Sequence, residues 1–294
     1  MLLNKRISII YFLGTIKFDL LRIVLYATTV GLLDKYSTFR EISIPLPVTA
    51  VIGTAVSLLL AFRTGQSYER WWEARIIWGA IVNDSRTLIR QVSAFYIGPD
   101  RETFIRDFVY RQAYWCKALT ASLRKIPLPA DVQQYLAAHS IEGQNIPNIL
   151  LSVHSDEIRR AFINKHINQF QEVQLDSSIV NLCNSMGRCE RIKNTVFPKS
   201  YSMLIHFLIY FFLTVLPFGL ADDHFLVEIA LCIAIPSIFI AIEKTSILMQ
   251  DPFEGLPLDT PMSTISTTIE SNLREMVGEP NLPPQPVEEN YYVL

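Results

Sequence analysis

The sequence predicts an all-α membrane protein with four transmembrane helices and a large cytosolic helical bundle. Hydrophobic residues make up 50% of its 294 residues and charged residues only 18%, which is below the share of about a quarter in soluble domains. The mean hydropathy of +0.26 is too high for an ordinary cytosolic enzyme and too low for a chain made only of membrane helices. Membrane helices joined to a water-facing part fit both values.

Four segments are predicted to cross the membrane, because a helix needs roughly 20 apolar residues to span the hydrocarbon core. They are 18–33, 45–62, 201–221 and 225–242. The second has no charged residue, and the fourth has a single acid, Glu228. The first begins with Asp19 and Arg22, which lie three positions apart, share a helix face and are expected to neutralise each other.

Basic residues indicate the orientation of these spans. They precede the first, follow the second, precede the third and follow the fourth, whereas the link 221–224 is short and acidic. The positive-inside rule therefore predicts a multi-pass protein of the cell (inner) membrane with both termini cytoplasmic. The predicted organisation is a membrane-surface helix and two spans in 1–62, a cytosolic helical region in 63–199, two spans in 200–243, and a cytosolic helix with an extended tail in 244–294.

The region between the second and third spans has the period of amphipathic helices. Apolar residues recur at every third or fourth position in 67–96, 104–123 and 158–192, without an alternating strand pattern. A further helix is predicted for 261–276, and 279–294, with four prolines, is predicted to be extended. The water-facing part is therefore expected to be a helical bundle.

Charge, cysteine content and motifs exclude several classes of protein. The net charge of −2 gives no basic surface for nucleic acid. The four cysteines form no CxxC pair, so neither a disulfide framework nor a zinc site is expected. The chain has no glycine-rich phosphate loop, no HExxH and no GxSxG, so we expect no enzyme, no cofactor and no metal.

His206 is an ionisable residue inside the third span. Such a residue is a candidate functional group, because charge is costly within the membrane. The alternative is a neutral imidazole that is hydrogen-bonded to a neighbouring helix. The sequence alone leaves both interpretations open.

The second span contains many small residues, which allow helices to approach closely. Within it, Thr54, Leu58 and Phe62 are spaced by four and form one stripe. Repeated around a symmetry axis, the stripe would form rings, and the apolar rings of Leu58 and Phe62 could gate ions by losing their water. Ordinary helix packing would also produce such a stripe.

Four blocks of the sequence resemble the bestrophin family, in particular its bacterial branch. They are Arg70-Trp71-Trp72, the run 78–86, Cys189 to Ile192 followed by Phe197-Pro198, and Asp251-Pro252-Phe253-Glu254-Gly255. The blocks occur in the family's order and cover most of the chain. The Arg-Trp-Trp triplet is expected to brace the junction between the second span and the cytosolic helices, with Arg70 reaching lipid headgroups or a carboxylate such as Glu73.

The resemblance implies a homopentameric channel in the lipid membrane that passes small monovalent ions through a pore on the five-fold axis. Aligned on the Arg-Trp-Trp triplet, the hydrophobic neck of the pore falls at Thr54, Leu58 and Phe62, which is the stripe found from spacing. Thr54 replaces the bulky apolar residue that is usual in the family. A lower constriction is expected near Phe170 or Val173.

The resemblance also bears on gating and selectivity. Eukaryotic bestrophins are opened by calcium, held partly by acids after the Pro-Phe motif; this chain has only Glu254 and Asp259 there, so we predict no calcium gating. The family is described as chloride channels, but an apolar neck does not select the sign of an ion. Five copies of Asp222-Asp223 would concentrate cations if this link faces the pore mouth. The sequence therefore slightly favours cations. The alternative function is a membrane-anchored helical scaffold or regulatory protein without ion conduction.

Overall fold

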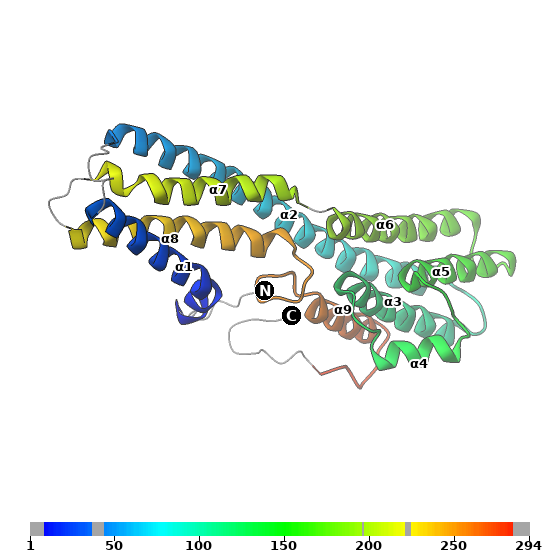
Figure 1. Ribbon diagram of the computed structural model, residues 1–294. Helices are drawn as coiled ribbons and strands as arrows, with labels where there is room; N and C mark the ends of the chain where they lie inside the picture. Colours follow the sequence, from blue (N-terminus) through cyan, green and yellow to red (C-terminus); the bar gives the residue numbers. More distant parts are fainter. Residues whose placement is uncertain (1–8, 37–43, 196, 221–224, 285–294) are drawn as a thin grey trace. The chain divides into compact units, whose positions relative to one another are not determined.

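The computed structural model describes residues 9–36, 44–195, 197–220 and 225–284, and it is built from helices (Figure 1). In chain order they are α1 Ile9–Tyr36, α2 Leu46–Phe95, α3 Arg101–Arg124, α4 Ala130–Ala138, α5 Ile146–Ile163, α6 Gln169–Asn194, α7 Lys199–Val215, the 3-10 turn η2 Pro217–Gly219, α8 Phe225–Gln250 and α9 Met262–Met276. These described residues contain no strand, as the sequence predicts.

Contacts between the helices divide the chain into two units. Among the described residues, the apolar unit comprises 9–36, 44–70, 197–220 and 225–250, and the bundle unit comprises 71–195 and 251–284. Helix α2 contributes to both units and runs without a break through the boundary predicted at residue 62.

In the apolar unit, α1, the first part of α2, α7 and α8 share one core of aliphatic and aromatic side chains. Its most buried members include Ile23, Val56, Leu60, Ile209 and Leu213. Within residues 9–36, the predicted surface segment and the predicted first span form one continuous helix, α1, since no proline separates them.

Two of the described helices, α2 and α8, are long and apolar enough to cross a membrane, and a third span is counted if α6 and α7 are taken as one broken segment. Helix α7 has only 17 residues: Pro198 directly precedes it, and Pro217, which has no backbone N–H to donate, lies just beyond its end. Helix α1 contains Lys17, Asp19 and Arg22. Length and composition alone therefore support fewer spans than the four predicted.

In the bundle unit, α3 is the central helix and packs against α5 and α9. Trp78 from α2 and Trp115 from α3 are fully buried in its core. The helix predicted for 261–276 is present as α9. The described part of this unit is therefore built from helices, as the sequence predicts for the water-facing part.

One predicted helix is two helices in the structure. The periodic segment 158–192 is interrupted between the end of α5 at Ile163 and the start of α6 at Gln169. Lys165 adopts a left-handed backbone with φ of 61°, and Asn168 and Gln171 form a capping box that starts α6. Periodicity does not reveal this break, because apolar residues recur at helical spacing on both sides of it.

Candidate ion pathway

Helix α2 is a single helix of 50 residues (Figure 1) and carries the three predicted neck residues. Leu58 and Phe62 are 57% and 59% exposed in the isolated chain, and Thr54 is exposed as well. The Thr54 hydroxyl donates to the carbonyl oxygen of Ala50 at 2.8 Å, so it is satisfied within the helix. The structure thus places all three residues on one exposed face of α2.

The opposite face of α2 is packed within its own chain. Val56, Leu60 and Arg63 are each 1% exposed. They are interleaved with the neck residues in sequence but point elsewhere, since a helix turns by roughly 100° per residue. Helix α2 therefore has one face buried within this chain and, on the opposite side, an apolar stripe that the chain leaves uncovered.

Arg63, the residue directly after Phe62, belongs to a buried ion pair. Arg63 Nη1 donates to Glu243 Oε1 at 3.0 Å, and His206 Nδ1 lies 2.9 Å from the same oxygen. The Arg63 guanidinium also lies over the ring of Phe197, 5.3 Å from its centroid. A buried pair needs such further contacts, because both ions have given up their hydration. This cluster links α2, α7 and α8 immediately beyond Phe62.

His206 therefore contacts a neighbouring helix, as one of the two interpretations of the sequence expects. Asp19 and Arg22 pair at 3.3 Å, which confirms that prediction, and Asp19 also lies 3.1 Å from Lys244 Nζ. Sequence reasoning missed the pair of Arg63 and Glu243, because its members are 180 residues apart and only the fold brings them together.

The Arg-Trp-Trp triplet is held by backbone carbonyl groups around the Asp-Pro-Phe block. Arg70 Nε donates to the carbonyl oxygen of Gln250 at 2.9 Å, and Trp71 Nε1 donates to that of Leu258 at 2.7 Å. Trp72 is 48% exposed. The triplet thus contacts residues on either side of the Asp-Pro-Phe block, far away in the sequence.

Glu73, the carboxylate expected near Arg70, has other basic partners in the bundle unit. It accepts from Arg191 Nη2 at 2.8 Å and lies 3.6 Å from Arg188 Nη2. Both arginines belong to α6, so Glu73 joins α6 to α2.

The other predicted motif residues have structural positions. Pro198 is the residue before α7, and Asp251 directly follows the last residue of α8. The carbonyl oxygen of Pro252 accepts from the Thr260 amide at 3.1 Å, which closes the loop. Phe253 is 1% exposed and belongs to the core of the bundle unit. These residues shape a loop.

The same loop is organised by Asp259, which is 1% exposed. Its Oδ2 accepts from the amides of Gly255 at 2.7 Å and Leu256 at 3.0 Å. Burial raises the pKa of Asp259, and these amides act against the rise. Glu254 accepts from Lys193 Nζ at 2.6 Å. Both acids of the stretch expected to bind calcium in eukaryotic bestrophins are therefore engaged by other groups of this chain.

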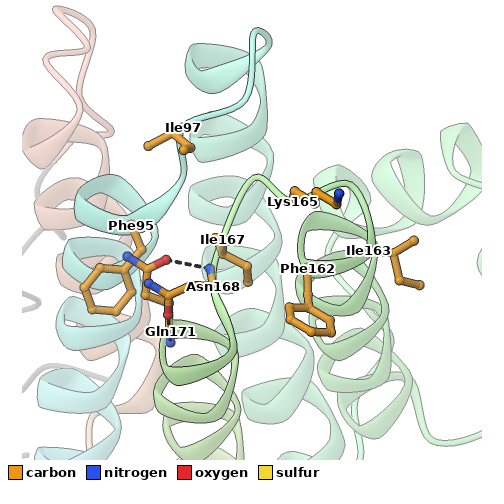
Figure 2. A pocket seen from close by; sticks show the side chains of 8 residues that line it. All are labelled: Phe95, Ile97, Phe162, Ile163, Lys165, Ile167, Asn168 and Gln171. Carbon is orange, nitrogen blue, oxygen red and sulfur yellow. Dashed lines mark hydrogen bonds between the residues drawn. The ribbon is translucent and has the colours of Figure 1, made fainter.

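The predicted lower constriction lies in the first turns of α6. Phe170 and Val173 are 86% and 62% exposed. A mainly apolar cavity of about 610 Å³ adjoins the start of this helix (Figure 2). At its edge Asn168 and Gln171 each accept from the other's backbone amide, at 3.0 and 2.8 Å (Figure 2). This capping box fixes where α6 begins.

Asp222 and Asp223, on which the cation preference depends, lie outside the described residues. Within the part of the chain that the structure does describe, no group of three or more His, Cys, Asp or Glu side chains is placed to hold a metal ion.

Comparisons with known proteins point to one family. The family described as Bacterial/Fungal Bestrophin protein matches residues 8–275. A voltage-dependent anion channel-forming protein of Ralstonia nicotianae is 31% identical over 241 residues, which are 79% of this chain and 78% of that protein. One from Escherichia coli is 27% identical over 286 residues, 96% of this chain and 93% of that protein. The crystal structure of a bacterial bestrophin homologue from Klebsiella pneumoniae has a TM-score of 0.82 and 26% identity, and covers 90% of this chain and 100% of its own.

Proposed function

Because this chain belongs to the bacterial and fungal bestrophin family, we propose that it is the subunit of a homopentameric ion channel whose axial pore is lined by α2. The channel passes small monovalent ions. Its neck is formed by five copies of Thr54, Leu58 and Phe62, and the apolar rings of Leu58 and Phe62 are the barrier that ions must cross.

The observation that carries this proposal is the two-sided character of α2. Val56, Leu60 and Arg63 are buried in the subunit, while Leu58 and Phe62 are more than half exposed. An exposed apolar stripe opposite the buried face of a helix is typical of a surface that another molecule covers. When subunits close into a ring around an axis, neighbouring subunits cover the two sides of this stripe, and the centre of the stripe faces the pore.

The membrane topology belongs to the same proposal. The four spans are α1, the first part of α2, α7 and α8, whose core residues form one apolar cluster. The chain is a multi-pass protein of the inner membrane with both termini in the cytoplasm, and the bundle unit is cytosolic. The acid and base of α1, Asp19 and Arg22, pair with each other, which lowers the cost of placing them at the membrane.

The lower constriction is proposed at the start of α6. Phe170 is the favoured residue, because its side chain is 86% exposed although it is large and apolar. Val173, one turn further on, is the other candidate. The capping box of Asn168 and Gln171 holds this end of the helix in place.

Two observations favour permeant ions of opposite sign. The relatives from Ralstonia nicotianae and Escherichia coli are named for anion channels. The acidic link at Asp222-Asp223 instead favours cations in this chain. The apolar neck does not distinguish between them, so the proposal is limited to small monovalent ions.

Single-channel recording tests the proposed neck. Purified protein in planar bilayers is expected to conduct, and Leu58→Ala with Phe62→Ala is expected to raise the unitary current, because shorter side chains widen and wet the constriction. Val56→Ala is the matched control on the buried face and is expected to leave the current unchanged. An unchanged current in the double variant would remove Leu58 and Phe62 from the pore. A pentamer without current would favour the scaffold function instead.

A further inference from the structure

The apolar unit carries an open groove on one flank of α2. A cavity of about 490 Å³ lies between α2 and α8, with Ser57, Ala61 and Gly65 on the α2 side and Phe239 and Ile242 on the α8 side. A Cβ atom added at Gly65 would meet no other atom within 4 Å. The small side chains therefore leave space that this chain does not fill.

A ridge lies on the other flank of the same helix. Val51 is 69% exposed, and Ala55, one turn further along α2, is also exposed. Around the helix axis these residues lie roughly 60° and 100° to one side of Thr54, whereas Ser57 and Ala61 lie roughly 60° and 20° to the other side. On the same scale Leu58 and Phe62 lie roughly 40° and 80° to the ridge side of Thr54. The mean direction of the neck stripe therefore lies between the ridge and the groove, closer to the ridge.

We propose that the groove of each subunit receives the Val51–Ala55 ridge of the neighbouring subunit's α2. This inference rests on the proposed pentamer, since the neck is incomplete without neighbouring copies. The mean direction of the ridge and that of Ser57 and Ala61 in the groove differ by roughly 120° around α2, or by roughly 100° when Gly65 is included. In a ring of five, each subunit meets its two neighbours at about 108°, the interior angle of a regular pentagon, so the two angles agree.

The heights along the helix also agree. Copies related by rotation about the pore axis lie at the same depth, and Ala55 and Ser57 differ by only about 3 Å along α2. The contact joins two different surfaces of the same chain, so it continues from subunit to subunit until the ring closes. Small residues in the groove let the two helices approach closely. A lipid acyl chain is the competing occupant.

Disulfide trapping tests the contact. Ala55→Cys with Ser57→Cys is made in a Cys183→Ser background, because Cys183 is the cysteine that the structure finds exposed. The two new cysteines point roughly 160° apart on their own helix, so they cannot bond within one subunit. Oxidation of the full-length protein in membranes is expected to give a series of disulfide-linked oligomers up to a closed pentamer. Reductant is expected to convert them back to monomers.

Three control proteins accompany this variant. Each single cysteine variant is expected to give no such series. The pair Met203→Cys with Phe211→Cys, on the exposed face of α7, is expected to give none either. If the test variant purifies as an oligomer but forms no cross-links between subunits, the proposed contact is wrong.

A bulky side chain in the groove gives a second test. Ala61→Trp is expected to reduce the pentamer to smaller species in native mass spectrometry, with its helical circular dichroism retained. Met203→Trp on α7 is the control and should remain pentameric. An Ala61→Trp pentamer that has only lost co-purified lipid would mean that an acyl chain fills the groove, which overturns the inference. Cross-linked rings without current would count against the proposed channel, whereas current without cross-links would count against this contact alone.

Discussion

Arg63 and Glu243 form an ion pair between α2 and α8 in which Nη1 and Oε1 are 3.0 Å apart and the side chains are 1% and 0% exposed. The pair comes one residue after Phe62. It therefore fixes the rotation of α2 about its own axis, and that rotation decides which way Leu58 and Phe62 face. The proposed neck is therefore oriented by two charged residues that no local sequence pattern pairs.

Breaking this pair is expected to destabilise the protein strongly. In Glu243→Gln the buried Arg63 loses its counter-charge, and the expected loss is about 3 to 5 kcal/mol of unfolding free energy. Thermal unfolding in detergent measures it. The control is Glu254→Gln, which removes the more exposed pair with Lys193 and should cost at most about 1 kcal/mol. Equal losses in the two variants would show that the buried pair does not anchor α2.

Channel activity is expected to be independent of calcium. The two acids of the loop after α8 are occupied, since Asp259 accepts backbone amides and Glu254 accepts from Lys193. Calcium requires six to eight oxygen ligands, which this loop does not offer. Currents from reconstituted protein should be equal with calcium present and with calcium chelated. A steep dependence on calcium would contradict the account of this loop.

The acidic link is expected to influence ion selectivity. If Asp222 and Asp223 concentrate cations at the pore mouth, the reversal potential in a salt gradient shifts toward that of the cation. Asp222→Asn with Asp223→Asn should then move it toward the anion, because the variant ring carries less negative charge. An anion-selective reversal potential that the double variant leaves unchanged would refute the cation preference.

Protein stability is expected to fall in acid through His154. Its side chain is fully buried, and burial together with the nearby Arg111 guanidinium holds its pKa well below 6.5. Below about pH 6.5 the unfolded chain takes up a proton that the folded chain does not, so this contribution to stability is lost as the pH falls. The slope is at most about 1.4 kcal/mol per pH unit.

The variant His154→Gln removes that titration and should flatten the decline of the unfolding free energy between about pH 6.5 and 5. His139→Gln, at an exposed histidine, should decline like the parent protein. Parallel curves for His154→Gln and the parent would show that His154 does not couple folding to pH.

Much of the fold follows from apolar spacing. The helical character, the helix at α9 and the pairing of Asp19 with Arg22 are confirmed by the structure. The break between α5 and α6 was not predicted, because it depends on Lys165 backbone geometry and on the cap at Asn168, neither of which disturbs the apolar period.

The candidate site is less visible in the sequence. Spacing and the Arg-Trp-Trp block are enough to propose Thr54, Leu58 and Phe62, because a stripe on one helix is a local pattern. The pair of Arg63 and Glu243 depends on two helices meeting after 180 residues of chain, so no local pattern predicts it. The neck itself stays a prediction.

Thiol modification tests most directly whether α2 lines an aqueous pore. Leu58→Cys and Val56→Cys are each made in the Cys183→Ser background and exposed to a water-soluble methanethiosulfonate reagent during current recording. Leu58 is 57% exposed and Val56 is 1% exposed, although they are two residues apart on α2. We expect rapid block of the Leu58→Cys current and no effect on the Val56→Cys current. A Leu58→Cys channel that conducts normally and resists the reagent would place this face of α2 against lipid, and α2 would then not line the pore.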